Sequence, residues 1–473
     1  MRIPCGGRPE RCKPARRCPF AAWRDGYDKN DCHSWRQKQV KTKRPFAKVP
    51  RATSNPCRVA LIGFGTVGRA VAKILCERTN GSLQLTHICN RNVERKKQDW
   101  IGEDVIWTDS FQAVLDSDCD IVVELIGGLS PAGDWVRQAL QAGKSVVTAN
   151  KQLVAQCGPE LLQLANTNGC QLEFGASVAG GVPVLPALRT GMSGDRLHGI
   201  AGILNGTCNY ILSRIETARI PFSEALEEAQ ARGYAEADAS EDLDGGDARA
   251  KLAILALAGL RLSVSPGAIR ARTIRTIDAV DFDYAAELGC TIRQISRADM
   301  QGGTLFAEVG PSLVPVASPF GRVQRNLNLV LTSGAYGGDM AFLGAGAGGD
   351  PTAVAVVSDL LFVAETLARG SQQPAQKKLE LTSPQVSCNF ETPWYLRLVV
   401  KDQPGIIASL AGILSEHQLN IDAVLQKPGF DKNSLPFVIT LEPCRDAQLE
   451  PALQRMSALP FALRPCLCLP ILR

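Results

Sequence analysis

The sequence lacks the long apolar run that a membrane-spanning helix needs. Its longest apolar stretch, Leu252 to Leu260, is about half of the roughly 18 residues required. No apolar core of a secretory signal follows the start of the chain. With 45% hydrophobic and 21% charged residues, the composition also excludes a disordered or fibrous protein. The 473 residues predict two or three domains of a soluble, cytoplasmic protein with no membrane association.

The net positive charge of the chain comes entirely from its first 54 residues. Residues 1–54 contain 15 Lys or Arg against 4 acids, whereas the remainder carries a net charge of −6. Such a body offers no basic surface for nucleic acid. Residues 1–54 show no helix or strand period, and their cysteines lack the C-x2-C spacing of a zinc knuckle. We expect a disordered basic extension, with a zinc site or a transit peptide as alternatives.

Cysteine is plentiful, but its distribution does not indicate disulfides. The chain has 16 cysteines, and those beyond residue 54 are scattered, mostly through apolar segments, as at Cys89, Cys119 and Cys208. Thiols in such segments behave as small hydrophobic groups. The pattern favours a reducing compartment.

A glycine-rich turn follows the first apolar strand. The run C-R-V-A-L-I from Cys57 leads into G-F-G-T-V-G, then a helical stretch and a second strand, Leu83–Cys89. In such a βαβ unit the first glycine makes the turn, the second admits a pyrophosphate and the third allows close packing, while the helix N-terminus faces the phosphates. The predicted dinucleotide-binding residues are Gly63, Phe64, Gly65, Thr66, Val67 and Gly68.

The end of the second strand bears on the choice of cofactor. An NAD-selective site places an acid there to bind the ribose 2′-hydroxyl. This strand ends Cys89-Asn90-Arg91, and no acid follows until Glu94. Arg91 can donate a forked pair of hydrogen bonds to a 2′-phosphate. We predict a preference for NADP(H), with NAD(H) also possible.

Two further strands end in polar or glycine residues. Residues 120–125 run into Gly127-Gly128, and residues 145–148 run into Ala149-Asn150-Lys151. The carboxyl ends of parallel strands border the ligand crevice of an open α/β sheet. Lys151 is therefore predicted to face the cofactor, the alternative being a solvated lysine.

The densest polar cluster, residues 236–251, directly precedes the apolar run that ends at Leu260. Asp247 and Lys251 are four residues apart, so on a helix they share one face, with Cβ atoms about 5–6 Å apart. A lysine there can pass a proton to a carbonyl oxygen as hydride arrives, and nearby acids can bind an ammonium group. The alternative is a structural pair that stabilises the helix by a few tenths of a kcal/mol.

Several ordered blocks resemble homoserine dehydrogenase over about residues 57–370. They are V-A-L-I-G-F-G-T-V-G-R, D-I-V-V-E-L-I-G-G, V-V-T-A-N-K, A-S-V-A-G-G-V-P, G-I-L-N-G-T-C-N-Y-I-L, G-Y-A-E-A-D and D-x-x-x-K-L-A-I-L. The resemblance implies the reversible, NAD(P)H-dependent reduction of aspartate 4-semialdehyde to homoserine, on the pathway to threonine, methionine and isoleucine. It implies a homodimer or higher homo-oligomer.

The resemblance also implies an α/β fold with three parts. These are a Rossmann-type NAD(P)-binding domain at 55–180, an α+β substrate-binding and dimerisation domain at 181–330, and a segment at 331–370 that returns to the first domain. Residues 371–393 are rich in Gln, Pro, Ser and Lys, which indicates a linker.

Residue roles follow from the same resemblance. Substrate contacts fall on Glu236 and Asp247, with Asp242 in the same acidic loop, and the proton donor on Lys251. Lys151 matches the lysine near cofactor and substrate. Backbone contacts to the cofactor fall on Gly233 and Gly348.

The chain departs from the family pattern at Gly175. The family has a glutamate directly before A-S-V-A-G-G, where it holds a monovalent cation such as Na⁺ together with carbonyl oxygens. Val178, Gly180 and Val182 still offer such carbonyls, but the carboxylate is missing at Gly175. The departure puts the cation site in doubt.

The tail, residues 394–473, resembles an ACT domain, a ferredoxin-like regulatory module. It is expected to contain a strand at 395–400, a helix at 406–417 that Pro404 and Gly405 open, and a strand at 421–425. The amides at that helix start could receive the carboxylate of an amino acid effector such as threonine. The alternative is a dimerisation module with no ligand.

Two other functions stay open at this point. A semialdehyde dehydrogenase that oxidises through a thiohemiacetal needs a reactive cysteine, and Cys208 is the candidate. A non-catalytic amino acid sensor would use the ACT domain alone. The intact pair Asp247 and Lys251 favours catalysis over sensing.

Overall fold

The computed structural model describes residues 55–78, 81–369 and 381–472. Residues from Asn55 onward form one compact unit. The expected disordered extension and its alternative zinc site lie outside the described residues.

The first sheet has six parallel strands in the order β3-β2-β1-β4-β5-β6. Its members are β1 (Cys57–Ile62), β2 (Leu83–Cys89), β3 (Ile106–Thr108), β4 (Ile121–Glu124), β5 (Ser145–Thr148) and β6 (Leu172–Glu173). The order reverses between β1 and β4, as in doubly wound dinucleotide-binding domains, whose ligands lie beyond the strand ends at that reversal. The predicted Rossmann-type class is confirmed.

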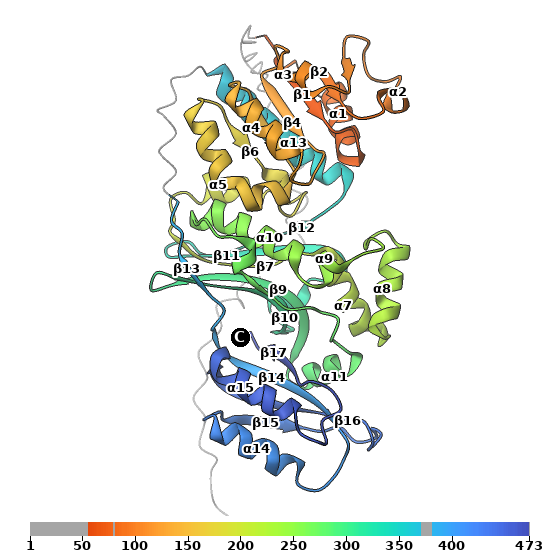
Figure 1. Cartoon of the computed structure of the whole chain (residues 1–473), viewed down its shortest axis with the longest axis vertical. Coiled ribbons are helices and arrows are strands. Elements are labelled where there is room, and N and C mark those ends of the chain that lie inside the picture. The colour runs from red at the N-terminus through yellow and green to blue at the C-terminus, as the bar shows by residue number, and fades with distance from the viewer. Residues whose placement is uncertain (1–54, 79–80, 370–380, 473) are drawn as a thin grey trace, which may run out of the picture. The chain divides into compact units, whose positions relative to one another are not determined.

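Helices cover both faces of this sheet (Figure 1). In β1, Val59 and Leu61 pack with α1 and α13, whereas Ala60 and Ile62 pack with α3, α4 and α5. Burial on both faces explains why these strands read as continuous apolar runs. The helices are α1 (Thr66–Arg78), α2 (Val93–Lys96), α3 (Phe111–Leu115), α4 (Ala132–Gln141), α5 (Lys151–Thr167) and α13 (Gly349–Ala368).

The second sheet has seven strands, in the order β12-β11-β7-β9-β10-β13 with β8 beside β10. They are β7 (Leu197–Ile203), β8 (Arg270–Ala271), β9 (Cys290–Gln301), β10 (Thr304–Pro315), β11 (Leu327–Gly334), β12 (Gly338–Ala345) and β13 (Gln385–Ser387). Gly302 and Gly303 join β9 to β10 with φ angles of 55° and 88°. A two-residue hairpin turn of this kind requires positive φ at both positions, which glycine permits.

The helices between β6 and β11 are mostly short, and η3 among them packs against α13 of the first domain. They are η3 (Gly175–Ser177), α6 (Val184–Pro186), η4 (Ala187–Gly191), α7 (Gly206–Ala218), α8 (Phe222–Ala231), α9 (Ser240–Leu243), α10 (Gly246–Leu255), η5 (Ala256–Leu260), η6 (Pro266–Ala268), α11 (Ala279–Glu287) and α12 (Pro319–Arg322). The mixed composition of this layer agrees with the predicted α+β class.

The strand pairing places two domain boundaries elsewhere than the sequence predicts. β11 and β12 extend the second sheet, so only α13 of the segment 331–370 returns to the first domain. The expected linker, 371–393, ends in structure because β13 pairs with β10 and Thr382 bridges Leu262. Two strands that the sequence did not predict, β12 and β13, lie at the edges of the sheet. Strand β12 is mostly exposed and begins and ends near glycines, so it lacks the alternating apolar pattern that marks a strand.

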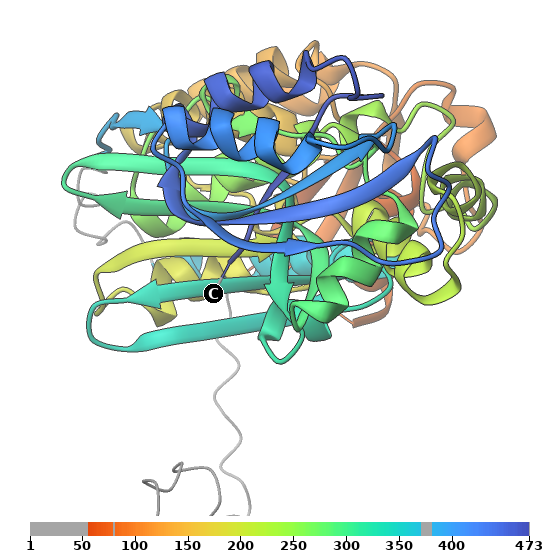
Figure 2. The ribbon, with the colours of Figure 1, turned by 90° about the horizontal axis from the view of Figure 1, so that it is seen from below.

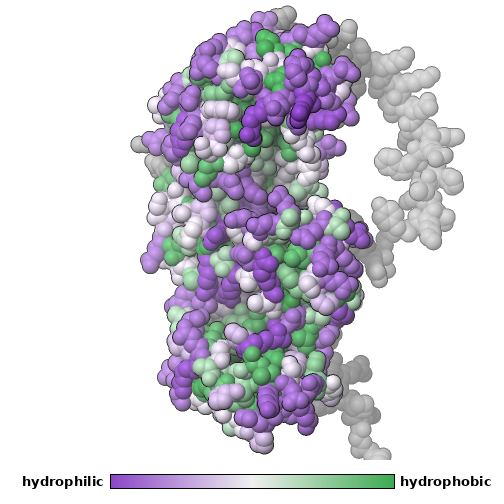
Figure 3. Space-filling view, turned by 45° about the vertical axis from the view of Figure 1, so that its right-hand side comes forward, coloured by the Kyte–Doolittle hydropathy of each residue, from purple (hydrophilic) through white to green (hydrophobic). Residues whose placement is uncertain are grey.

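Helix α13 is long and apolar enough, by length and composition alone, to cross a membrane. Acidic residues interrupt its sequence, so no unbroken apolar run marks it. Its buried residues, among them Ala353, Val356 and Leu360, pack against α1 and the first sheet. On the face shown in Figure 3, apolar residues lie in groups among hydrophilic ones. Packing in the domain core accounts for the buried face of α13, whereas its residues Val354, Leu361, Phe362 and Leu367 are exposed.

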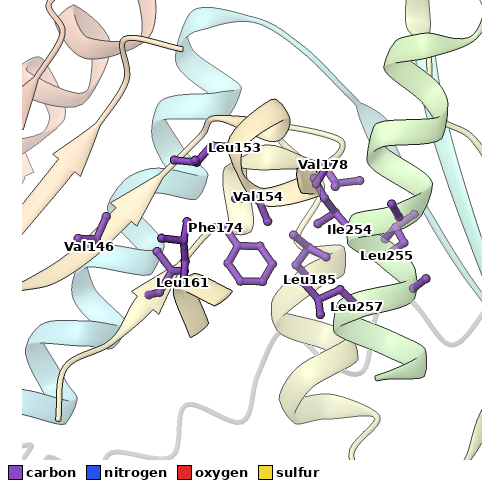
Figure 4. Packing of buried hydrophobic residues seen from close by; sticks show 14 of the residues in the cluster. Val146, Leu153, Val154, Leu161, Phe174, Val178, Leu185, Ile254, Leu255 and Leu257 are labelled. Atoms are coloured by element: carbon purple, nitrogen blue, oxygen red, sulfur yellow. The ribbon is translucent and has the colours of Figure 1, made fainter. Parts of the chain in front are cut away.

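One apolar cluster joins the first domain to the second. Figure 4 shows the ring of Phe174 among Leu161 of α5, Leu185 of α6 and Leu257 of η5. Each fully buried side chain of this size contributes about 1.5–3 kcal/mol. The cluster fixes α5 against α10, and the first turns of these two helices carry candidate catalytic residues.

The third sheet has the order β15-β16-β14-β17 and is antiparallel. Its elements are β14 (Glu391–Val400), α14 (Ile406–Glu416), β15 (Ile421–Leu425), β16 (Leu435–Arg445), α15 (Asp446–Ser457) and β17 (Leu467–Pro470). Both helices lie on the same face of the sheet (Figure 2). The predicted ferredoxin-like class is confirmed.

The other face of this third sheet packs on the second domain through alternate residues of β14. Trp394 faces the sheet's own helices, whereas Tyr395 lies in the cluster around α7 and α11. Arg397, 3% exposed, pairs with Asp278 at 2.8 Å and with Asp281 at 2.7 Å. The Tyr395 hydroxyl donates to Asp281 at 2.8 Å. Burial raises the pKa of Asp281 to about 6, although Arg397 opposes the rise.

We expect Arg397→Met to lower the free energy of unfolding by about 3 kcal/mol, because it leaves Asp281 buried without a counter-charge. The loss should be larger at pH 8 than at pH 5. The folded pKa of Asp281 lies above its unfolded value, so at pH 5 the carboxyl is largely neutral and needs the guanidinium less.

Denaturant unfolding at both pH values tests this expectation, with Arg445→Met as the control. Arg445 pairs with Glu391 on the exposed surface, where such pairs contribute about 0–1 kcal/mol. Equal, small losses in the two variants would contradict a stabilising role for the buried pair.

Candidate active site

The glycine turn after β1 leaves room for a phosphate group. Gly63 has φ +98°, and a side chain there would meet the backbone of Leu125 at 2.9 Å. A Cβ at Gly68 would collide with the carbonyl oxygen of Gly63, whereas no atom lies within 4 Å of a Cβ at Gly65. The third glycine thus allows close packing and the second leaves open space at the start of α1. These features fit a dinucleotide pyrophosphate.

The remaining residues of the turn are held by β2 and β3. The Phe64 N–H donates to the side-chain oxygen of Asn90 at 3.0 Å, and its ring packs edge-on to Trp107. Thr66 and Val67 begin α1. Sequence reasoning used Asn90 only to mark the end of a strand and missed its contact with the turn.

Arg91 follows β2 and is exposed. Among the described residues, its side chain makes no hydrogen bond or ion pair. The basic residues Arg95, Lys96 and Lys97 follow within a few positions. Arg91 is therefore placed at the strand end with its guanidinium uncommitted, as recognition of a ribose 2′-phosphate would need.

Gly348, which is predicted to contact the cofactor, lies at the start of α13, and the next residue contacts the start of α1. Gly348 precedes α13 with φ +132°, and a Cβ on the next residue, Gly349, would lie 2.9 Å from the Thr66 side chain. The starts of α13 and α1 are thus neighbours, although they are almost three hundred residues apart in sequence.

Lys151 is the first residue of α5, directly after β5. Asn150 caps the helix by accepting the Leu153 N–H at 3.1 Å. The Lys151 ammonium pairs with Asp247 of the second domain. At the end of β5, the half-exposed Lys151 of the first domain thus forms an ion pair with the buried Asp247 of the second domain.

Asp247 and Lys251 lie on one face of α10, as their spacing predicts. Gly245 precedes the helix with φ +81°, a left-handed turn that glycine permits. Lys251 Nζ lies 2.7 Å from Asp247 Oδ2 and donates to the carbonyl of Leu204 at 2.9 Å. The lysine is thus held by two acceptors and keeps a third N–H for another partner.

The Asp247 carboxylate is buried between two lysines. Burial alone would raise its pKa, but the charges of Lys251 and Lys151 outweigh burial and lower the pKa. Burial opposes the charged form of Lys151, and Asp247 overcomes this so that the pKa of Lys151 rises. Asp247 therefore stays ionised and keeps Lys151 protonated at neutral pH.

Asp242 lies beside this cluster in a different electrostatic state. Burial raises its pKa, the hydrogen bond from Asn205 lowers it, and the charge of Asp247 raises it further. Asn205 joins the two acids, because its amide nitrogen lies 2.6 Å from Asp242 Oδ1 and 2.9 Å from Asp247 Oδ2. Sequence reasoning missed Asn205, although its place before a helix marks it as a capping residue.

Glu236 and Gly233 lie on the loop after α8. Gly233 has φ +73°, and Glu236 is exposed. Within the described residues, the Glu236 side chain makes no hydrogen bond or ion pair, and only its carbonyl is bound, by Gln230 at 3.1 Å. The structure thus brings together Lys151, Asp242, Asp247 and Lys251 and leaves Glu236 outside their hydrogen-bonded cluster.

The carboxylate of Asp359, on α13, occupies the space that a glutamate side chain at position 175 would take. A Cβ at Gly175 would lie 2.7 and 2.8 Å from the carboxylate oxygens of Asp359 on α13, and the Gly175 N–H donates to Asp359 at 2.7 Å. Burial and the nearby Glu173 raise the pKa of Asp359 to about 7. Glu173 itself pairs with Arg189.

The predicted carbonyl ligands follow Gly175 closely in sequence. Val178 and Val182 are buried, and Gly180 has φ +23°. Among the described residues, no three His, Cys, Asp or Glu side chains form a metal-binding group. We assign no catalytic step to a cation.

Cys208 does not fit the role of a nucleophile. It is fully buried, burial and the adjacent acids raise the pKa of its thiol, and Sγ donates to the Asp242 carbonyl at 3.2 Å. A buried neutral thiol is unreactive. The structure therefore gives no support to a thiohemiacetal mechanism.

A large cavity lies apart from this cluster. It measures about 1220 Å³ and is bordered by α5, η4 and η5, with Glu173 and Arg189 in its wall. Neither Asp247 nor Lys251 lines it. The cavity and the cluster of Lys151, Asp247 and Lys251 are therefore separate features of the structure.

Family models match three parts of the chain. Residues 63–175 match the model described as homoserine dehydrogenase, NAD binding domain, and residues 183–361 match the homoserine dehydrogenase model. Residues 394–461 match the ACT domain.

Curated relatives agree with these matches. The chain is 35% identical over 398 residues to homoserine dehydrogenase of Bacillus subtilis, with 81% of this chain and 91% of the relative covered. It is 35% identical over 417 residues to homoserine dehydrogenase of Synechocystis, with 85% and 96% covered.

Solved structures give the same result. A homoserine dehydrogenase from Thiobacillus denitrificans superposes with a TM-score of 0.82 at 32% identity, covering 88% of this chain and 98% of that one. A hyperthermophilic archaeal homoserine dehydrogenase in complex with NADPH has a TM-score of 0.57 at 26% identity, covering 66% and 98%.

We expect Gly175→Ala to lower the free energy of unfolding by about 1–3 kcal/mol, because the added Cβ would overlap the Asp359 carboxylate. The penalty should largely disappear when Asp359→Ala is present as well, since the overlapping atoms are then gone. A double-mutant cycle by denaturant unfolding measures this coupling.

Gly191→Ala is the matched control. No atom lies within 4 Å of a Cβ at Gly191, and its φ is not positive. We expect a change within about 0.5 kcal/mol. If Gly175→Ala were as harmless as the control, Asp359 could not occupy the place described.

Proposed function

The chain belongs to the homoserine dehydrogenase family, and we propose that it catalyses the reversible, NAD(P)H-dependent reduction of aspartate 4-semialdehyde to homoserine. The observation that carries this proposal is the ion-paired cluster of Lys151, Asp247 and Lys251 around a buried carboxylate. It joins the dinucleotide-binding domain to the second domain at the strand ends, where a bound nicotinamide would meet a substrate. Oxidoreductase activity follows from the family, and the cluster supplies a lysine that can protonate the oxygen of a reduced carbonyl group.

Lys251 is the proposed proton donor in the reductive direction. Bound nicotinamide supplies or accepts the hydride. As negative charge develops on the carbonyl oxygen, the Lys251 ammonium donates a proton to it, and in the reverse direction the neutral amine removes the hydroxyl proton. Asp247 and the Leu204 carbonyl orient the ammonium and leave one N–H for the substrate oxygen.

The acids around this lysine suit an amino acid substrate. Asp242 and Glu236 are proposed to bind the substrate ammonium, and Lys151 supplies a positive charge near both cofactor and substrate. Asp242 already lies beside Asp247 through Asn205. Glu236 is exposed on a loop that Gly233 opens, so its contribution requires the loop to close over the substrate.

NADP(H) is the proposed preferred cofactor. Arg91 stands exposed at the end of β2, and no acid occupies the strand end to bind a bare 2′-hydroxyl. The relative solved in complex with NADPH is consistent with this choice. NAD(H) use stays open, because nothing at the strand end excludes the unphosphorylated ribose.

The biological setting is proposed by the same reasoning. The reaction would serve the synthesis of threonine, methionine and isoleucine in the cytoplasm, and the ACT domain would confer feedback by an amino acid such as threonine. A homodimer would pair through β12, an exposed edge strand with Met340 and Leu343 at the surface. A purely sensory protein is disfavoured, because amino acid sensing by the ACT domain would not require Lys151 and Lys251 to pair with a buried carboxylate.

We expect Lys251→Ala to reduce kcat by 10²–10⁴-fold while leaving NADPH binding intact, since general acid catalysis is commonly worth that much. The rate of absorbance change at the NADPH band, with aspartate 4-semialdehyde as substrate, measures turnover, and quenching of protein fluorescence measures cofactor binding. Lys73→Ala is the matched control, because Lys73 also pairs with an acid four residues away but on the exposed surface of α1. A Lys251→Ala variant that kept more than about a tenth of wild-type kcat would refute the assignment.

We expect Arg91→Ala to raise the KM for NADPH at least tenfold and to change the KM for NADH much less, because loss of a forked hydrogen bond to a phosphate costs about 1.5–3 kcal/mol. Steady-state rates with each cofactor give the two values. Arg369→Ala, at the exposed far end of α13, controls for loss of charge alone. Equal effects on both cofactors would show that Arg91 does not read the 2′-phosphate.

A further inference from the structure

Asn205 sits at the junction between β7 and α7, directly beside the catalytic cluster. It is 3% exposed. Its side-chain oxygen accepts the Cys208 N–H at 2.8 Å and so caps α7. With the oxygen committed to the helix, the amide nitrogen must face the other way.

That nitrogen uses both of its hydrogens on carboxylates. One goes to Asp242 Oδ1 at 2.6 Å and the other to Asp247 Oδ2 at 2.9 Å. Asp247 Oδ2 also receives the Lys251 ammonium at 2.7 Å. Asn205 therefore binds the same oxygen as the proposed proton donor and links it to the second acid.

Helix capping by itself does not call for asparagine here. Serine, threonine and aspartate cap as well, because each accepts the N–H with a side-chain oxygen. Among these residues only asparagine can accept that bond and still donate two hydrogen bonds from the same side chain. The identity of residue 205 is thus explained by the two carboxylates and not by the helix.

The two carboxylates need such a bridge because they are buried side by side. Asp242 faces Asp247 and Lys251 from α10 and Lys151 from α5, and the Cys208 thiol holds its carbonyl. The Asn205 hydrogen bond favours the ionised form of Asp242, which burial and Asp247 disfavour. Without the amide, Asp242 would take up a proton more readily or turn away from Asp247.

We propose that Asn205 is a positioning residue that holds Asp242 and Asp247 at a fixed separation, and through Asp247 fixes the ammonium of Lys251. The inference rests on the proposed function, since it assigns the positioned groups to substrate binding and proton transfer. Asn205 itself touches neither the reacting atoms nor the cofactor turn among the described residues.

The experiment compares wild type with Asn205→Ser and Asn205→Asp, both of which keep an oxygen that can cap α7. For Asn205→Ser we expect a fall in kcat/KM for homoserine of roughly 10–100-fold, the equivalent of about 1.4–2.7 kcal/mol. The acidic limb of its pH profile should move to higher pH, because Asp242 loses the hydrogen bond that favours its charged form. NADP⁺ binding, measured by fluorescence quenching, should stay unchanged.

Asn205→Asp gives an independent signature. At pH 8 a third carboxylate joins the cluster, and activity should fall below that of Asn205→Ser. As the pH is lowered, the new carboxyl takes up a proton and regains one donor, so activity relative to wild type should rise. A residue that only caps a helix would give a ratio that does not depend on pH.

Ser110→Ala is the control for loss of a cap. Ser110 caps α3 in the first domain by accepting the Ala113 N–H at 3.4 Å. We expect this variant to lose melting temperature and to keep wild-type kcat.

The outcomes separate the two claims. Wild-type protein that fails to oxidise homoserine would refute the proposed function. An active wild type with Asn205→Ser that keeps its kcat/KM and pH profile would overturn the role of Asn205. Should Asn205→Ser not fold, Asn205→Asp decides, and a pH-independent activity ratio in that variant would equally overturn the inference.

Discussion

The buried Asp247 carboxylate is the charge around which the proposed active site is built. It ion-pairs with Lys151 from the first domain and Lys251 from its own helix. A carboxylate in that position is tolerable only with both lysines and the Asn205 amide around it. The apolar packing of α5 on α10 brings these partners together, so domain assembly and catalytic geometry are one requirement.

The parts of this arrangement that depend on local sequence could be predicted. The glycine turn, the strand ends and the four-residue spacing of Asp247 and Lys251 follow from backbone geometry and helix periodicity. Lys151 could be assigned to the crevice because parallel strands end at one edge. What the sequence could not show is that the Lys151 ammonium reaches Asp247, ninety-six residues further along the chain, because that contact depends on how two domains pack.

The features that escaped prediction are those made by residues far apart in sequence. Asp359 lies 184 residues after Gly175 and fills the space beside it, so no local sequence pattern predicts that Asp359 takes the place of the missing glutamate. The sequence marks Asn205 only as a helix cap. Its hydrogen bonds to Asp242 and Asp247 form only when α9 and α10 pack beside it. Strand β12 escaped for a different reason, because an exposed edge strand shows little apolar alternation. Tyr395 and Arg397 alternate with core residues of β14, but only the packed sheet reveals that their side faces α11.

The central claim is that Lys251, held by Asp247 and the Leu204 carbonyl, transfers the proton at the substrate oxygen. A crystal structure with NADP⁺ and homoserine tests it most directly. Lys251 Nζ is expected within about 2.6–3.2 Å of the homoserine hydroxyl oxygen, with the carbon that bears it facing the nicotinamide. A complex in which Lys251 stays bound to Asp247 and Leu204 while the hydroxyl contacts a different side chain would contradict it.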